Sequence, residues 1–281
     1  MRFDWAAYAA RLRLPARPTI DAAGLAVLQR HHRLAIPFEN LDVMLGRGIA
    51  IDSESVFAKL VTAGRGGYCF EHNRLFGDAL ADLGFEARAL LARVWLDAIT
   101  TPPPNHAVTL VTIEGEPWLA DAGFGGSYSP PMPLIDGAEA SAPDGARFRL
   151  RADNGGWLLE RDGDAATTDG RGSGEGWRAQ YNFTLAPVSD DDLAAGSRWA
   201  SGAADSRFTR LRIASMVLPR GFAGLTDRRY RRLAGADMSE AEISDPRVYR
   251  IRLAMMFGID LTAEEVARLG LFSGPGIAAP R

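Results

Sequence analysis

The sequence predicts an α+β fold, because three successive parts of the chain differ in their hydrophobic pattern. Residues 1–85 carry apolar side chains at the three- and four-residue spacing of amphipathic helices. Residues 86–187 contain short segments rich in β-branched and aromatic residues, separated by turn residues, which is typical of an antiparallel sheet or barrel. Residues 188–281 mix the two patterns. A hydrophobic fraction of 47% in 281 residues is enough for a substantial core.

Four helices are expected in the first part. Asp21 and Ser53 are the expected N-caps of the second and third helix, and Gly64 and Gly84 the expected ends of the third and fourth. The fourth begins at or near Cys69. The segments are FDWAAYAARLRL (3–14), DAAGLAVLQRHHRLAI (21–36), SESVFAKLVTAG (53–64) and CFEHNRLFGDALADLG (69–84).

Strand patterns dominate the second part and alternate with helix patterns in the third. The expected strands of the second part lie within 85–96, 106–113, 117–124, 146–153, 156–162 and 177–187. In the third part, we expect strands within 207–218 and 221–233 and helices within 189–201, 246–259 and 262–270.

Composition excludes several classes of function. The net charge is −3 and the sequence pI is about 5.9, so no overall positive field attracts nucleic acid or anionic lipid. One cysteine cannot form an internal disulfide. The N-terminus is interrupted by charges, unlike a signal peptide, and the apolar runs are too short to span a membrane. These features predict a cytoplasmic protein.

The only cysteine, Cys69, lies in the stretch GRGGYCFEHN (64–73). A single cysteine is more often a small buried hydrophobe than a nucleophile. Here Gly66 and Gly67 permit a tight turn with positive φ, and Cys69 falls at a predicted helix start. Unpaired backbone N–H groups and the helix dipole favour a thiolate there and can hold an oxyanion. Cys69 is therefore a candidate nucleophile.

A thiolate nucleophile needs a base, and the chain has four histidines. His31 and His32 are adjacent in a charged helix, where a solvated face is the better interpretation. His72 shares the helix of Cys69 and stays possible, although it would point along the helix axis. His106 is better placed, because it follows the stiff segment TPPPN and opens a predicted strand.

Asp121, in the next predicted strand, is the candidate partner of His106. A turn at Gly115 and Glu116 would put Asp121 opposite position 110, and a loop over 112–115 would put it directly opposite His106. Both registers place the two side chains on one face, but only the second brings them into contact, so a bulge or the longer loop is expected. Each signal is weak alone; together they indicate a Cys-His-Asp triad.

Four motifs of the chain resemble those of the arylamine N-acetyltransferases. The resemblance runs from about residue 5 to 260 and is weakest after about 190, where only the general layout and DSRF (205–208) match. Its motifs are RLAIPFENLD (33–42), RGGYCFEHN (65–73), PPNHAVTLV (103–111) and WLADAGFGG (118–126).

This resemblance implies a fold and an activity. The fold has a helical bundle with the nucleophile (1–85), a β-barrel with His106 and Asp121 (86–187) and an α/β lid (188–281), around a cysteine-protease-like (transglutaminase-like) catalytic core. The activity is ping-pong transfer of acetyl from acetyl-CoA, through acetyl-Cys69, to arylamines, arylhydrazines or N-arylhydroxylamines. Acetyl-CoA is then a co-substrate, and no metal, permanently bound cofactor, nucleic acid or membrane partner is expected. The oligomeric state stays open.

The resemblance also suggests supporting residues. It pairs Glu39 with Arg65 beneath the nucleophile, and it makes His72 a departure, since many bacterial members have glutamine there. The stretch GFGGS is the expected backbone cradle for CoA phosphates: Gly123, Phe124, Gly125, Gly126 and Ser127. Aromatic residues are candidates for an apolar substrate pocket, although each could equally be ordinary core: Phe38, Tyr68, Trp95 and Phe124.

Three alternatives stay open from the sequence. The same motifs fit an amide synthase that closes macrolactams with an acyl chain from a carrier protein. They also fit a papain- or transglutaminase-like thioester hydrolase. The third alternative, a binding module without catalysis, is disfavoured because all three triad residues are present.

Overall fold

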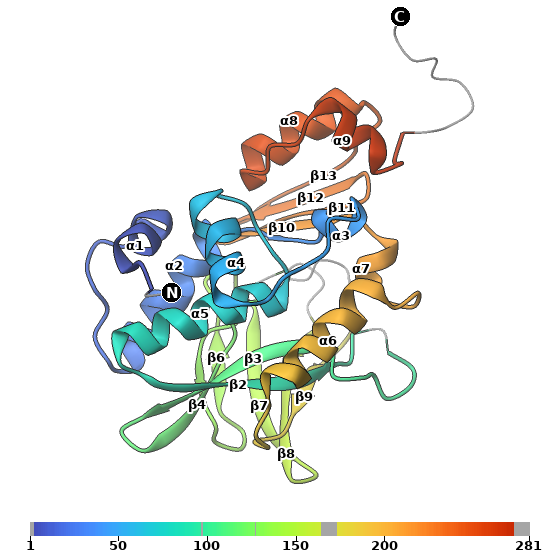
Figure 1. Cartoon of the computed structure of the whole chain (residues 1–281). Helices are drawn as coiled ribbons and strands as arrows, with labels where there is room; N and C mark the ends of the chain where they lie inside the picture. Colours follow the sequence, from blue (N-terminus) through green and yellow to red (C-terminus); the bar gives the residue numbers. More distant parts are fainter. Residues whose placement is uncertain (1–2, 97, 127, 164–172, 273–281) are drawn as a thin grey trace, which may run out of the picture.

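The computed structural model describes residues 3–96, 98–126, 128–163 and 173–272. Within these ranges, no helix combines the length and the apolar character needed to cross a membrane. The N-terminal part is helical, as predicted (Figure 1). Its helices are α1 (Trp5–Leu12), α2 (Ala22–Ala35), α3 (Leu41–Met44), α4 (Ser53–Phe57), the π-helix η1 (Ala58–Thr62) and α5 (Cys69–Leu83).

The predicted helix ends are confirmed, except for one cap. The Asp21 side chain accepts a hydrogen bond from the Gly24 N–H at the start of α2, and Gly84 ends α5 in the left-handed conformation. The N-cap of α4 is Asp52, not Ser53, because the Asp52 carboxylate reaches the Ser55 N–H at 2.9 Å. An aspartate at this position also interacts favourably with the positive end of the helix dipole.

The middle of the chain forms an antiparallel eight-stranded sheet with the strand order β5-β4-β3-β2-β9-β8-β7-β6. Its two edge strands follow one another in sequence, joined by residues 134–138, so the sheet curls into a nearly closed barrel. Its strands are β2 (Glu86–Val94), β3 (His106–Ile113), β4 (Glu116–Ala120), β5 (Met132–Pro133), β6 (Glu139–Ser141), β7 (Arg147–Asp153), β8 (Gly156–Asp162) and β9 (Trp177–Phe183).

A second antiparallel sheet, ordered β1-β10-β11-β12-β13, joins the two ends of the chain. Phe38 of β1 pairs with Ser215 of β10, so the N-terminal part supplies an edge strand. The segment predicted as one strand over 207–218 is instead a short helix followed by a strand. The strands are β1 (Phe38–Glu39), β10 (Ile213–Leu218), β11 (Gly221–Thr226), β12 (Arg229–Ala234) and β13 (Asp237–Glu242), and the helices are α6 (Asp190–Gly202), α7 (Arg207–Arg210), α8 (Pro246–Phe257) and α9 (Ala263–Arg268).

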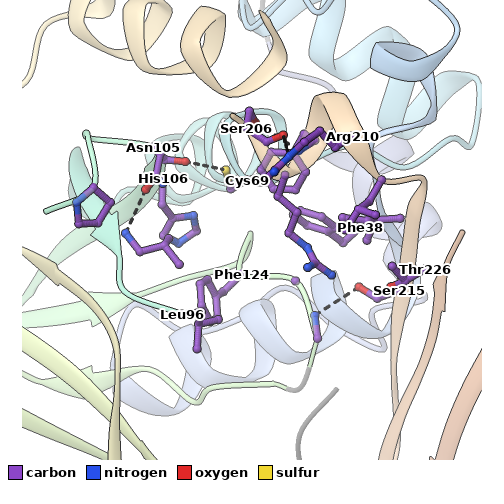
Figure 2. A pocket seen from close by; sticks show the side chains of 18 of the residues that line it. Phe38, Cys69, Leu96, Asn105, His106, Phe124, Ser206, Arg210, Ser215 and Thr226 are labelled. Carbon is purple, nitrogen blue, oxygen red and sulfur yellow. Dashed lines mark hydrogen bonds between the residues drawn. The ribbon is translucent and has the colours of Figure 1, made fainter. Parts of the chain in front are cut away.

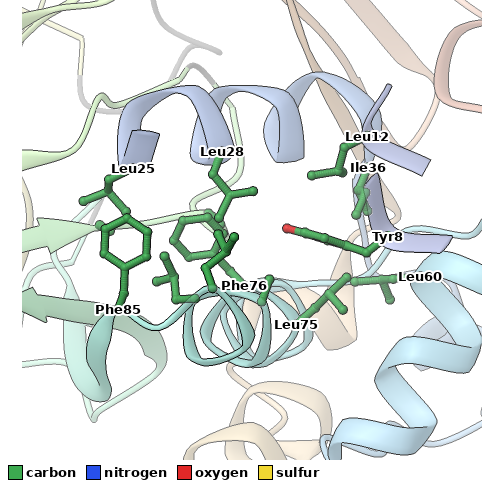
Figure 3. Packing of buried hydrophobic residues seen from close by; sticks show 14 of the residues in the cluster. Tyr8, Leu12, Leu25, Leu28, Ile36, Leu60, Leu75, Phe76 and Phe85 are labelled. Atoms are coloured by element: carbon green, nitrogen blue, oxygen red, sulfur yellow. The ribbon is translucent and has the colours of Figure 1, made fainter. Parts of the chain in front are cut away.

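Helix α5 is held between α1, α2 and the barrel (Figures 1 and 3). Leu28 of α2 and Phe76 of α5 are fully buried in this core, and α5 also contacts β2 and β3. Burying a side chain of this size stabilises the fold by roughly 1.5–3 kcal/mol. Because α5 is packed along its length, its first residue, Cys69, has a fixed position relative to β3.

Candidate active site

A cavity of about 790 Å³ opens where α5, the barrel and the second sheet meet. Cys69 and His106 line it, together with the aromatic rings of Phe38 and Phe124 (Figure 2). Its far side is formed by residues of α7 and of β10 to β12. The cavity therefore contains a thiol, an imidazole and apolar rings from three different parts of the chain.

Cys69 is the first residue of α5, as predicted, and it is almost fully buried. The two preceding glycines act differently from the prediction, because neither has a positive φ; Gly64 does. A Cβ on Gly66 would lie 2.3 Å from the Pro37 carbonyl oxygen, and a Cβ on Gly67 would lie 2.7 Å from the Glu71 carboxylate. Glycine is required there for close approach of neighbouring groups and not for its conformational freedom.

The structure brings Cys69, His106 and Asp121 together. The Nε2 of His106 lies 2.7 Å from Oδ2 of Asp121. The Cys69 side chain is close enough to the His106 ring to act on its pKa, and because Nε2 faces Asp121, Nδ1 is the nitrogen left for the thiol. The Cys69 Sγ also donates a hydrogen bond to the Asn105 carbonyl at 3.9 Å. Burial alone would lower the pKa of His106, but the Asp121 charge and hydrogen bond, with Cys69, raise it to about 10. Despite its own burial, the pKa of Asp121 is lowered by His106 and by the Gly123 N–H. The pair favours an imidazolium beside the thiol.

The β3–β4 hairpin differs from both predicted registers. Ile113 pairs with Glu116, so the turn is Glu114–Gly115, and both turn residues have a positive φ. In this register position 106 faces position 123, and Asp121 lies diagonally across from His106 on the same face. Because β4 ends at Ala120, the chain is free to bend and bring the carboxylate to the ring. The shared face was correctly predicted, but no bulge or longer loop is needed.

Two amide side chains that were not among the predicted site residues hold Asp121 in place, one at its carboxylate and one at its backbone. The Asn73 side-chain N–H group donates to Asp121 Oδ1 at 3.2 Å and to the Ala107 carbonyl at 2.6 Å. The Oε1 of Gln29 accepts a hydrogen bond from the Asp121 backbone N–H at 2.9 Å. Asn73 could have been found, because it lies four residues after Cys69 on the same helix face. Gln29 carried no such signal.

The predicted CoA cradle is partly occupied by the protein's own hydrogen bonds. The Gly123 N–H donates to Asp121 Oδ1, and the Gly126 N–H donates to Ser215 Oγ. Buried Arg33 donates to the carbonyls of Ala122, Phe124 and Gly126. These bonds make the loop rigid and leave fewer N–H groups for a phosphate than the glycine pattern predicted. Gly123, Phe124, Gly125 and Gly126 line the cavity, whereas Ser127 lies outside the described residues.

Two of the four predicted pocket aromatics line the cavity, Phe38 and Phe124. The Phe124 ring lies edge-on to the His106 ring, with 5.1 Å between centroids. Tyr68 and Trp95 do not line it, which corrects the prediction. The Tyr68 hydroxyl is buried and donates to the Ser197 carbonyl, and the Trp95 indole N–H donates to Asn182, so a polar partner holds each ring elsewhere.

The other histidines are engaged in structure. His32 is fully buried and not on a solvated face, so that prediction was wrong. Its Nδ1 lies 2.8 Å from the Tyr8 hydroxyl, and its Nε2 lies 2.8 Å from Nδ1 of His72. Nε2 of His72 lies 3.1 Å from the Pro37 carbonyl oxygen. Because both nitrogens of His72 are used, it is not available as the base for Cys69.

A group of charged side chains lies beneath the loop before Cys69. Arg65 contacts Glu39 at 2.6 Å and Asp42 at 3.2 Å. Lys59, the only lysine of the chain, contacts Asp42 and Glu71. No group of three or more His, Cys, Asp or Glu side chains among the described residues is arranged to bind a metal ion.

A thiol, a buried imidazole and a carboxylate in this order, at a cavity with aromatic rings in its wall, are the arrangement of a cysteine-dependent acyl-transfer site. A family model described as "N-acetyltransferase" matches residues 21–266. The chain belongs to this N-acetyltransferase family and is an acyltransferase.

Named relatives cover most of the chain. An E. coli arylamine N-acetyltransferase is 35% identical over 216 residues, 76% of this chain and 73% of that protein. A Salmonella typhimurium arylamine N-acetyltransferase / N-hydroxyarylamine O-acetyltransferase is 36% identical over 247 residues, 86% of this chain and 83% of that protein.

Solved structures are similar over nearly the whole length. The arylamine N-acetyltransferase from Salmonella typhimurium has a TM-score of 0.86 at 32% identity, covering 94% of this chain and 96% of that chain. The Mycobacterium marinum arylamine N-acetyltransferase in complex with CoA has a TM-score of 0.85 at 29% identity, covering 95% and 98%.

Proposed function

We propose that this protein transfers an acetyl group from acetyl-CoA to arylamines, arylhydrazines or N-arylhydroxylamines through an acetyl-Cys69 intermediate. The observation that carries the proposal is the contact of His106 with both Cys69 and Asp121 at the wall of the cavity. The names of the relatives support the choice of acetyl group and acceptor. An amide synthase or a thioester hydrolase on the same fold is not favoured by any of them.

In the first half-reaction, the Cys69 sulfur attacks the acetyl carbonyl carbon of acetyl-CoA. His106 has accepted the thiol proton, and Asp121 holds the ring with Nε2–H toward the carboxylate. The bond from the carbonyl carbon to the CoA sulfur breaks, and His106 returns the proton to that sulfur. One thioester replaces another, so this step is close to balanced in energy.

In the second half-reaction, the acceptor nitrogen attacks the carbonyl carbon of acetyl-Cys69. An aromatic amine is largely unprotonated at neutral pH and arrives as a nucleophile. His106 accepts the proton that the nitrogen loses, and the bond to the Cys69 sulfur breaks. Water must be kept from the acetyl-enzyme, and the rings of Phe38 and Phe124 supply apolar cavity walls for this purpose.

The charge of the cavity lining supports acetyl-CoA as the co-substrate. Arginines line its far side, opposite the 123–126 loop, and guanidinium groups are the preferred side chains for phosphate. They are Arg207, Arg210, Arg229 and Arg231. We propose that the CoA phosphates lie between these arginines and the loop, and the CoA complex of the Mycobacterium marinum relative supports a site for this co-substrate.

The single cysteine makes the test direct. Mass spectrometry of the protein after acetyl-CoA treatment should show one acetyl adduct, absent in Cys69→Ser. Adding an arylamine such as aminosalicylate should remove the adduct and produce the N-acetyl product. Rapid loss of the adduct in water alone would instead indicate the hydrolase, and no adduct from acetyl-CoA would count against the proposed function.

A further inference from the structure

A chain of hydrogen bonds runs through the helical core to the cavity wall, outside the Cys69–His106–Asp121 group. It joins Tyr8 of α1, His32 of α2 and His72 of α5, all fully buried, and ends at the Pro37 carbonyl. None of these side chains takes part in the acetyl transfer proposed for Cys69, His106 and Asp121. Three polar groups in one apolar core are costly unless every one is bonded, so their arrangement calls for an explanation.

The positions of the protons in this chain follow from its end point. The Pro37 carbonyl can only accept, so Nε2 of His72 carries a proton. Burial lowers the pKa of His72 to about 3 and also lowers that of His32, so both rings are neutral. Nδ1 of His72 therefore accepts from Nε2–H of His32, and Nδ1 of His32 accepts from the Tyr8 hydroxyl. The hydrogen bonds of the series therefore all run in one direction, from Tyr8 toward Pro37.

The end of the chain supports a residue of the cavity. The His72 ring is nearly parallel to the Phe38 ring, with an interplanar angle of 10° and 6.2 Å between centroids. Phe208 lies against Phe38 at 5.8 Å, and a Cβ on Gly125 would lie 3.1 Å from the Phe38 ring. Phe38 also follows Pro37, the acceptor of the His72 N–H. With the His72 ring stacked beside it, Phe38 lines the cavity together with Phe208 and Gly125 (Figure 2).

We propose that the Tyr8–His32–His72 chain positions Phe38 and so determines how well the cavity accepts an aromatic acceptor. The three residues are positioning residues, since none of them lines the cavity. The hydroxyl of Tyr8 selects the tautomer of His32, and His32 in turn selects the tautomer of His72. In this tautomer, His72 donates to the Pro37 carbonyl, and that bond holds the His72 ring against Phe38. This inference rests on the proposed function and adds a determinant of acceptor specificity to it.

Two variants separate the effect of the His72 ring from the effect of the Tyr8–His32–His72 hydrogen bonds. His72→Gln can still donate to Pro37 and accept from His32, but it removes the ring beside Phe38. Tyr8→Phe keeps every ring and removes only the hydroxyl that fixes the His32 tautomer. Tyr230→Phe is the matched control, because Tyr230 is a buried tyrosine of β12 that does not line the cavity.

The activity readout is the ratio of kcat/KM for an arylamine to that for hydrazine, which has no ring to contact Phe38. We expect His72→Gln to lower this ratio roughly three- to tenfold, the scale of one aromatic contact, with a smaller decrease in Tyr8→Phe. The rate at which acetyl-CoA acetylates Cys69 should stay within about twofold of the parent, because a wholly structural defect would slow both half-reactions. Tyr230→Phe should leave the ratio unchanged.

A second readout does not need turnover. Nitrogen-15 NMR of the four histidine rings should show His72 protonated at Nε2 in the parent and a changed tautomer population in Tyr8→Phe. If the parent protein transfers no acetyl group, the proposed function fails. The affinity of each variant for an arylamine, measured by NMR titration, then replaces the ratio of kcat/KM values.

The two readouts decide each part of the proposal. A ratio or affinity unchanged in His72→Gln would overturn the role of His72. An effect in His72→Gln with no change of ratio or tautomer in Tyr8→Phe would overturn the roles of Tyr8 and His32. His72 protonated at Nδ1 in the parent would overturn the chain itself.

Discussion

His106 contacts Asp121 at 2.7 Å although the two residues are not opposite each other in the β3–β4 hairpin. The two carboxylate oxygens of Asp121 have different hydrogen-bond partners. Oδ2 faces the imidazole, whereas Oδ1 accepts hydrogen bonds from the Gly123 N–H at 2.9 Å and from Asn73 at 3.2 Å. The side chain therefore cannot rotate without losing bonds on both sides, and this fixes the tautomer of His106.

Asp121→Asn is expected to fold and to lose most activity. The Asn oxygen must stay toward Gly123 and Asn73, both donors, so its NH₂ group would face Nε2 of His106. That group donates, which moves the His106 proton to Nδ1 and leaves no acceptor for the thiol proton. We expect kcat/KM to fall by about 10³–10⁴, the scale of a wrong-tautomer histidine. Steady-state kinetics with acetyl-CoA and an arylamine measure this, and unchanged turnover would remove Asp121 from the mechanism.

The His106–Asp121 pair should make the free energy of unfolding depend on pH. The pKa of folded His106 is about 10, above its ordinary 6.5, so its contribution is complete below pH 6.5 and is lost as the pH rises toward 10. The pKa of Asp121 is lowered below 3.8, so its contribution is present above that pH and is lost in acid. Urea unfolding of the parent and of Asp121→Asn should differ most between pH 3.8 and 6.5. A difference that does not change up to pH 10 would contradict this.

Gly123→Ala should damage both stability and activity. The added Cβ would lie 2.5 Å from the Asn73 side chain and 2.8 Å from Cys69 Cα, and the backbone of α5 cannot yield. We expect the free energy of unfolding to fall by about 1–3 kcal/mol and kcat to fall with it. The matched control is Gly77→Ala in the same helix, where a Cβ meets nothing within 4 Å. This control should raise stability by up to about 1 kcal/mol, and the same sign for both variants in chemical denaturation would refute the packing argument.

Glu39→Gln should destabilise the loop beneath Cys69. Glu39 Oε1 accepts hydrogen bonds from Arg65, and Oε2 accepts one from the Leu41 N–H. A glutamine would place its NH₂ group, which is a donor, opposite one of these two donors, so one of the hydrogen bonds would be lost. We expect a loss of about 3 kcal/mol, typical of a broken buried ion pair. Arg151→Ala, at the exposed Arg151–Asp136 pair, should change stability little. Equal effects of the two variants in urea unfolding would show that burial of the Glu39 pair is unimportant.

Local patterns predicted most helices and strands, and they placed Cys69 correctly at a helix start. Cys69 at the start of a helix, Gly84 at its end and the shared face of His106 and Asp121 all follow from short-range spacing. Several of the predictions that failed involve partners far away in sequence. His32 was expected in solvent because its neighbours are charged, but Tyr8 and His72 surround it. Tyr68 and Trp95 were expected in the pocket because they are aromatic and near the motifs, yet Ser197 and Asn182 hold them elsewhere.

The sequence by itself predicted Cys69, His106 and Asp121 as candidates for the chemistry, because a thiol at a helix start and a His–Asp hairpin are local features. Tertiary structure alone decided which groups hold them in place. Asn73, Gln29 and Arg33 reach the 121–126 segment from α5 and α2, across 48 or more positions of the chain. Such bonds depend on how helices pack on the barrel, and no short-range pattern records that packing. The sequence marks Cys69 as a candidate nucleophile, and the packing of α5 on the barrel brings His106 to the same cavity.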